Sequence, residues 1–121
     1  MLPELPDNFH EGEIAAIQAG PRRELTLTIT GAFPDPGSNG HRYHVQTWAV
    51  RFGGIDNMEE VRAFCSPTLL GRRIGNLHYA GDEISRAHRL IVVLTMYDDD
   101  ALLRIRCRNL TARQHLLEVS P

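Results

Sequence analysis

The chain has 121 residues, of which 42% are hydrophobic and 23% charged, and its formal net charge is −2. This composition excludes a disordered chain, and the length predicts a single domain over residues 1–121 that buries a core without a metal or a disulfide. The charge is uneven, because residues 1–61 contain four Arg and nine acidic residues whereas residues 62–121 contain nine Arg and six acidic residues. We therefore expect an acidic and a basic region on one molecule. The negative net charge also disfavours nucleic acid as a partner.

The sequence predicts a cytoplasmic protein. No apolar run is long enough to cross a membrane, and the first residues, MLPELPDNFHEGE, lack the basic start and apolar segment of an export signal. Cys65 and Cys107 are far apart and form no CxxC pair, so we expect two reduced, buried thiols. All 13 basic residues are Arg, which excludes Schiff-base chemistry on Lys.

The first segment after the Pro-rich start, residues 10–19, carries conflicting signals. Asn8 with Glu11 fits a capping box, and Gly20 before Pro21 fits a helix end. Gly12 in the first turn argues against a helix. Both alternatives remain open on the residues alone.

Two strands are predicted next. Residues 22–33, RRELTLTITGAF, alternate strictly between Leu or Ile and Thr, which is typical of a half-buried strand. A loop, PDPGSNG, follows at 34–40. Residues 41–52 are again strand-like, but their apolar residues change side, which indicates a bulge or a strand that passes between two packing layers.

One short helix is predicted at 57–64. Asp56 stands three residues before Glu59, as in an N-cap with its partner, and Met58, Val61 and Cys65 share one helical face. Pro67 ends the element. The Gly-rich segment 69–84 predicts an irregular strand at a sheet edge.

The segment 90–110, LIVVLTMYDDDALLRIRCRNL, predicts a β-hairpin. Its first strand, 90–96, is apolar at nearly every position, as expected at the centre of a sheet. In its second strand Leu103, Ile105 and Cys107 point to one side and three arginines to the other. After the hairpin, TARQHLLEVSP at 111–121 indicates a short C-terminal helix, with Thr111 and Gln114 in capping-box register.

Together these elements predict a mainly β protein. The antiparallel sheet must cover its apolar face with a second layer, so we expect a compact sandwich or a bent sheet covered by a helix. No internal repeat or linker divides the chain.

Two groups of polar residues are candidate metal sites, and both are disfavoured. The carboxylates of Asp98, Asp99 and Asp100 suit calcium, but they lack the spacing of a calcium loop and more often form a solvated hairpin tip. The six histidines include no HxH and no helical HxxxH, so structural or surface roles are favoured over zinc. We therefore expect no cofactor.

The arginines of the hairpin form the best candidate binding surface. Arg104, Arg106 and Arg108 share one strand face, and Arg89 extends the stripe across the hairpin. Three guanidinium groups on one face suit a phosphate or the acidic surface of another protein. The alternative is a solvent face whose arginines pair with Asp or Glu of the adjacent strand.

Three pieces of the sequence, in order, resemble a family of small bacterial proteins. They are FHEGEI at 9–14, LTLTI at 25–29 and VRFGGIDNMEEV at 50–61. The family is reported among the immunity proteins of polymorphic toxin systems and opens with a Phe-His-Asp-x-Glu-hydrophobic motif. Glu11 replaces the motif Asp here. The resemblance covers the first half of the chain and implies that 10–19 is a strand.

The same resemblance implies binding to a toxin rather than catalysis. Its motif positions here are His10, Glu11 and Glu13, which either contact a partner or fix the first strand and the lead-in loop through hydrogen bonds.

We therefore expect a non-enzymatic protein that acts by protein–protein binding, with an immunity protein as the specific hypothesis. No P-loop, GxGxxG, GxSxG or HExxH motif occurs. The alternative is a small-ligand or metal-binding module with a pocket beside Trp48, Tyr43 or Tyr79 and a His or Asp at its mouth.

Overall fold

A computed structural model describes residues 2–35, 39–80 and 90–115. Within these residues the chain forms two antiparallel sheets and one short α-helix, so the mainly β prediction is confirmed. The larger sheet has the order β1-β2-β3-β7 and the smaller has the order β4-β5-β6. The strands are β1 (Glu13–Gly20), β2 (Glu24–Pro34), β3 (Tyr43–Gly53), β4 (Ile74–Tyr79), β5 (Leu90–Met96), β6 (Leu102–Cys107) and β7 (Asn109–His115).

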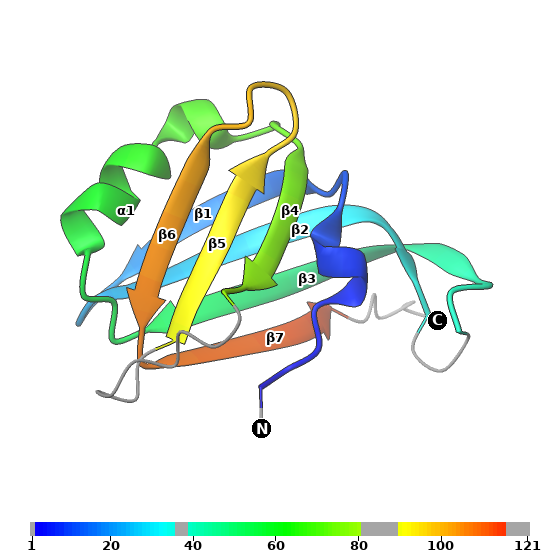
Figure 1. Ribbon diagram of the computed structural model, residues 1–121, viewed down its shortest axis with the longest axis horizontal. Helices are drawn as coiled ribbons and strands as arrows, with labels where there is room; N and C mark the ends of the chain where they lie inside the picture. Colours follow the sequence, from blue (N-terminus) through cyan, green and yellow to red (C-terminus); the bar gives the residue numbers. More distant parts are fainter. Residues whose placement is uncertain (1, 36–38, 81–89, 116–121) are drawn as a thin grey trace, which may run out of the picture.

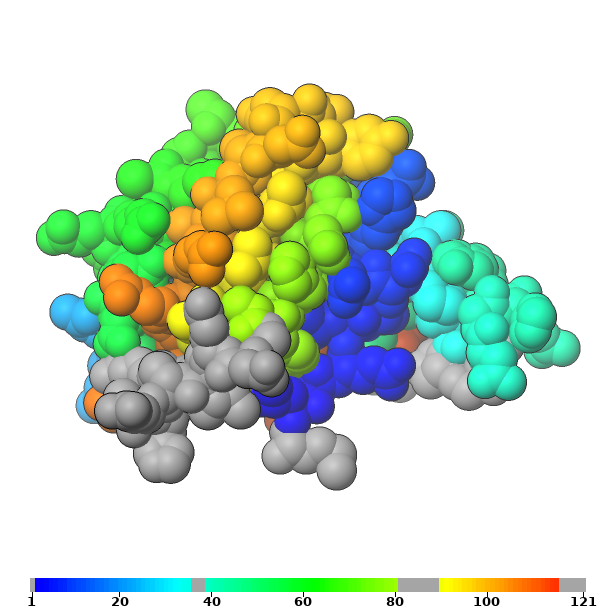
Figure 2. Space-filling model, in the orientation of Figure 1, coloured from blue at the N-terminus to red at the C-terminus, as the bar shows by residue number. Residues whose placement is uncertain are grey.

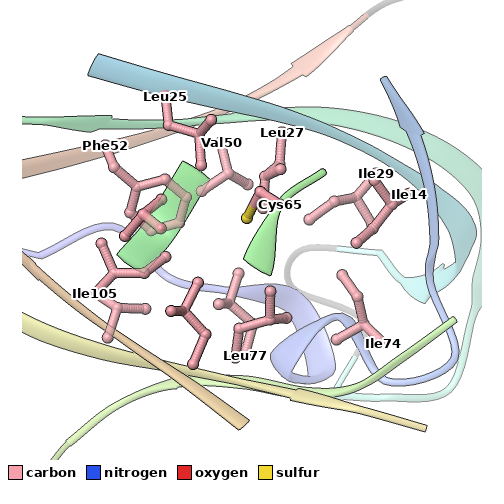
Figure 3. Packing of buried hydrophobic residues seen from close by; sticks show 14 of the residues in the cluster. Ile14, Leu25, Leu27, Ile29, Val50, Phe52, Cys65, Ile74, Leu77 and Ile105 are labelled. Atoms are coloured by element: carbon pink, nitrogen blue, oxygen red, sulfur yellow. The ribbon is translucent and has the colours of Figure 1, made fainter. Parts of the chain in front are cut away.

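The two sheets face each other, and the smaller sheet lies across the larger one with its strands at a steep angle (Figure 1). The apolar side chains of both inner faces meet between them (Figure 3). Leu25, Leu27 and Ile29 of β2 are at most 1% exposed, while the intervening threonines face outward. This sandwich, rather than a sheet covered only by a helix, is how the chain hides its apolar faces from water.

The helix α1 (Met58–Phe64) lies beside β6 and sends Met58 and Val61 into the core (Figure 1). The predicted helix is therefore confirmed, but the predicted N-cap residue, Asp56, is wrong. Asn57, not Asp56, precedes the first turn. The side chain of Asn57 is turned to β6 instead of capping the helix, as described below.

β1 confirms the strand implied for residues 10–19, with a later start. Residues 10–12 form a turn, in which Glu11 has a φ of 63° and donates its N–H to the Ile74 carbonyl. A Cβ on Gly12 would lie 2.7 Å from Cγ2 of Ile29, so only glycine fits where the chain enters the core.

The bulge expected in 41–52 is wrong for β3. β3 pairs with β2 in continuous register, whereas the described bulges lie in β1 and β4. The apolar residues on the other side of the strand are instead exposed to solvent. Tyr43 and Val45 are 53% and 78% exposed, and they lie at the beginning of β3, which extends past the smaller sheet (Figure 1).

The predicted hairpin is confirmed as β5 and β6, with β5 at the centre of the smaller sheet. The strand ends at Cys107, however, and after Arg108 the chain crosses to the larger sheet as β7. The prediction of a C-terminal helix is therefore wrong for residues 111–115, which pair with β3. Pairing with an available sheet edge outweighs the local capping signal of Thr111 and Gln114. Residues 116–121 lie outside the described part of the chain. The predicted edge strand at 69–84 is confirmed as β4, at the edge of the smaller sheet, and its residues 81–84 also lie outside the described part.

Segments that are not strands hydrogen-bond to both edges of the smaller sheet. At β6 the Asn57 side chain makes the two hydrogen bonds that the backbone of a neighbouring strand would make. Its Oδ1 accepts the Arg106 N–H at 3.0 Å, and its Nδ2 donates to the Arg104 carbonyl at 2.6 Å. At β4 the Ile74 N–H donates to the Gly12 carbonyl at 2.7 Å. Both edges are thereby closed to further pairing along these stretches.

Substitution Asn57→Ala tests this edge. It removes both bonds to β6, so we expect the free energy of unfolding to fall by about 1–2 kcal/mol in urea denaturation. Glu60→Ala is the matched control, because it removes only the contact between Asn57 Nδ2 and Glu60 Oε2, and we expect little change. Equal stability of Asn57→Ala and the parent protein would show that these bonds do not hold the edge.

Candidate functional site

The outer face of the smaller sheet carries two of the predicted arginines. Arg104 and Arg106 project from β6 away from the core and are exposed. Figure 2 shows β6 in orange, between α1 in green and β5 in yellow. Their register partners on β5 are Val93 and Ile91. The alternative, an Arg face paired with Asp or Glu of the adjacent strand, is therefore wrong for β5. The cross-strand neighbours of both arginines on β5 are aliphatic residues.

A pocket of about 260 Å³ lies between this face and α1. Arg104, Arg106 and Ile91 line it on the sheet side, and Asn57 and Glu60 line it on the helix side. Glu60 supplies the carboxylate among these residues, and Asn57 holds its Oε2 at 3.0 Å. The pocket combines two planar cations with one apolar residue, an arrangement that suits a carboxylate attached to an apolar group.

Arg108 is not among the described residues that line this pocket. Arg108 lies between β6 and β7, and a Cβ on Gly54 would be 2.9–3.0 Å from the Arg108 side-chain carbons, so the stem of Arg108 packs over Gly54. Arg89 lies outside the described residues.

The motif positions near the N-terminus have structural contacts. His10 Nδ1 lies 2.7 Å from the Gly75 carbonyl, and Glu11 is bonded through its backbone to Ile74. Glu13 is exposed at the start of β1, in a bridge with Arg73. The three residues therefore make separate contacts with β4 and the residue before it. His10 fixes the lead-in loop to β4, as the structural alternative for this motif predicted.

The aspartate triplet forms the turn between β5 and β6. Asp99 Oδ1 accepts the Ala101 N–H at 3.1 Å and lies 2.9 Å from Arg72 Nη2. The backbone bond from Ala101 and the guanidinium of Arg72 lower the pKa of Asp99. Asp100 has a φ of 54°, which Asp tolerates in a tight turn. Within residues 2–35, 39–80 and 90–115, no three His, Cys, Asp or Glu side chains are placed to hold a metal ion.

Because Asp99 is already engaged by the Ala101 N–H and by Arg72, we expect the triplet not to bind calcium. We expect millimolar CaCl₂ to leave the melting temperature unchanged in a scanning calorimeter, because ligand binding to the folded state would raise it. A saturable rise that is absent in Asp98→Asn would contradict this expectation and restore the triplet as a metal site.

A second pocket, of about 210 Å³, lies beside Trp48. Trp48 and Asp35 line it, as the small-ligand alternative predicted for one of its aromatic residues. Tyr79 is engaged elsewhere, donating its hydroxyl to the Pro3 carbonyl at 2.7 Å. The sequence reasoning missed Gln46, which is 3% exposed and connects the polar groups behind this pocket. Its signal was a polar residue in the inward register of Trp48, Val50 and Phe52.

Comparison with known proteins adds no relative. No family model, curated protein or solved structure matches this chain. The resemblance to immunity proteins therefore stays a prediction from the sequence. No helix in the described residues is both long and apolar enough to cross a membrane.

Both thiols are poor nucleophiles. Cys65 and Cys107 are buried, as predicted, and burial raises the pKa of each to about 11. At pH 8 only about one thiol in a thousand would then be ionised, and the thiolate is the reactive form.

Ellman's reagent tests this burial. At pH 8 we expect neither thiol to react in the native protein over the time in which both react in 6 M guanidinium chloride. Fast reaction of a native thiol would contradict the pKa direction, and Cys65→Ser and Cys107→Ser identify which thiol reacts.

Proposed function

We propose that this chain is a non-enzymatic binding protein that recognises an acidic surface of another protein, and specifically that it is an immunity protein that neutralises a toxin. The observation that carries the proposal is the register of β5 and β6, which sets Arg104 and Arg106 beside Val93 and Ile91. A binding face of this kind offers charge for orientation and apolar area for affinity.

The pocket between β6 and α1 supports the same proposal. A partner carboxylate entering it would meet both guanidinium groups, and the aliphatic part of the same partner residue would contact Ile91. Glu60 opposes this entry by charge, so it sets a limit on affinity that an acidic partner must exceed.

The uneven distribution of Arg along the chain supports a role for this face in the rate at which the partner associates. The second half of the chain carries the excess of Arg, and a basic face accelerates association with an acidic partner at low ionic strength. The specific toxin-binding part of the proposal comes from the resemblance of the first half of the chain to immunity proteins.

The product of the gene adjacent to this one is the probe that tests the proposal. We expect co-expression of this chain to rescue growth from that product, and calorimetry to show direct binding. The double substitution Arg104→Glu, Arg106→Glu should weaken binding by at least about tenfold, and Glu60→Gln should strengthen it, because each changes the charge that the partner meets.

Arg113→Glu is the matched control, since Arg113 is an exposed residue of β7 on the other sheet. It should bind as the parent protein does. The proposal fails if the adjacent product does not bind, or if the double variant, folded by circular dichroism, binds as tightly as the parent protein.

A further inference from the structure

The pocket beside Trp48 is formed by segments that are distant in the sequence. Glu4 and Pro6 come from the N-terminal lead-in, the residues before β1. Pro34 and Asp35 come from the end of β2 and the residue after it, and Trp48 comes from β3. Its volume of about 210 Å³ is smaller than that of pockets for drug-sized ligands, so it suits a group of a few heavy atoms.

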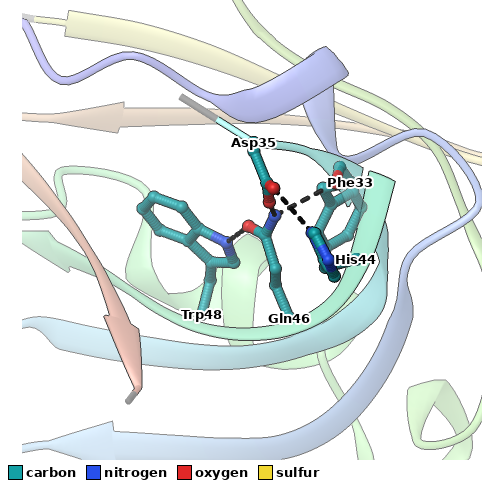
Figure 4. A network of polar contacts seen from close by, with 5 residues as sticks. All are labelled: Phe33, Asp35, His44, Gln46 and Trp48. Carbon is teal, nitrogen blue, oxygen red and sulfur yellow. Dashed lines mark hydrogen bonds and ion pairs between the residues drawn. The ribbon is translucent and has the colours of Figure 1, made fainter. Parts of the chain in front are cut away.

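Its walls are held rigidly from behind by Gln46 (Figure 4). Gln46 Oε1 accepts the indole N–H of Trp48 at 2.8 Å, and Gln46 Nε2 donates to the Phe33 carbonyl at 3.0 Å and to Asp35 Oδ1 at 3.3 Å. The indole and the carboxylate are therefore fixed relative to each other by one buried amide. A site whose groups are fixed before binding loses little conformational entropy when a ligand enters.

The charges of the lining favour a cation. Glu4 and Asp35 are acidic, and the described lining contains no Arg and no His. His44 contacts Asp35 from outside the pocket, with Nδ1 at 2.6 Å from Oδ2. The negative charge of a carboxylate attracts a nearby cation whatever hydrogen bonds the carboxylate already accepts.

The aromatic and Pro walls determine which cation fits. A bare metal ion prefers a complete set of oxygen ligands, whereas an organic cation gains from an indole ring and from apolar contact. Pro6 and Pro34 supply such contact without a competing backbone N–H.

We propose that the pocket formed by Trp48, Asp35 and Glu4 binds a small organic cation, in which an ammonium or guanidinium group contacts the indole and the two carboxylates. The ligand is either a free amine or the side chain of an Arg presented by another molecule. This site is separate from the Arg104 and Arg106 face, and it stands or fails independently of the proposed toxin binding.

Intrinsic fluorescence tests the proposal directly, because Trp48 is the only tryptophan of the chain. We expect choline chloride or N-acetyl-arginine amide to change the emission saturably, and 3,3-dimethyl-1-butanol, the uncharged analogue of choline, to produce no saturable change. Saturation by either cation supports the proposal, and the tighter of the two distinguishes the free amine from the Arg side chain. Calorimetry with the same cations supplies a reading that does not depend on fluorescence.

Variants assign the binding to this pocket. Glu4→Gln, at an exposed position, should weaken cation binding at least threefold without affecting the fold, and Asp35→Asn should weaken it further. Glu59→Gln on α1 makes the same change of charge away from the pocket and should leave binding unchanged. The proposal is overturned if neither cation saturates in fluorescence or calorimetry, if the uncharged analogue binds equally well, or if Glu4→Gln and Glu59→Gln behave alike.

Discussion

The hydrogen bonds along the two edges of the smaller sheet are the constraint on which this sandwich depends. A three-stranded sheet packed on a larger one buries its inner face, but its edges would otherwise present unpaired N–H and C=O groups. Asn57 satisfies these groups at β6 and residues 10–12 satisfy them at β4. The same contacts place α1 beside β6 and hold the lead-in against β4, so the two candidate pockets follow from the way in which the edges are closed.

The two pockets have opposite chemistry and are lined by different elements. The pocket beside α1 has Arg104 and Arg106, and the pocket beside Trp48 has Glu4 and Asp35. The arginines of one pocket and the acids of the other therefore belong to different elements. Each pocket favours an approaching group whose charge is opposite to that of its own charged pair.

For the candidate sites, the sequence indicated which residues share a strand face, but it did not indicate what each residue contacts. The alternation of β6 correctly predicted that Arg104 and Arg106 share a face, because side chains alternate along any strand. Alternation carries no information about Arg108, since the strand ends at Cys107 and the next residue joins two sheets. Likewise, His10 belonged to a recognisable motif, but its hydrogen bond to Gly75 joins residues 65 positions apart.

The sequence by itself determined the strands and their inward sides, because periods of two in β2 and β6 express a local rule of backbone geometry. It also determined the short helix, through the spacing of Met58, Val61 and Cys65. The tertiary structure decided which strands pair, that residues 111–115 extend the larger sheet, and that Gln46 joins Trp48 to Asp35. These features depend on groups brought together from distant parts of the chain, and local propensity is too weak to determine the outcome where a sheet edge offers a row of hydrogen bonds.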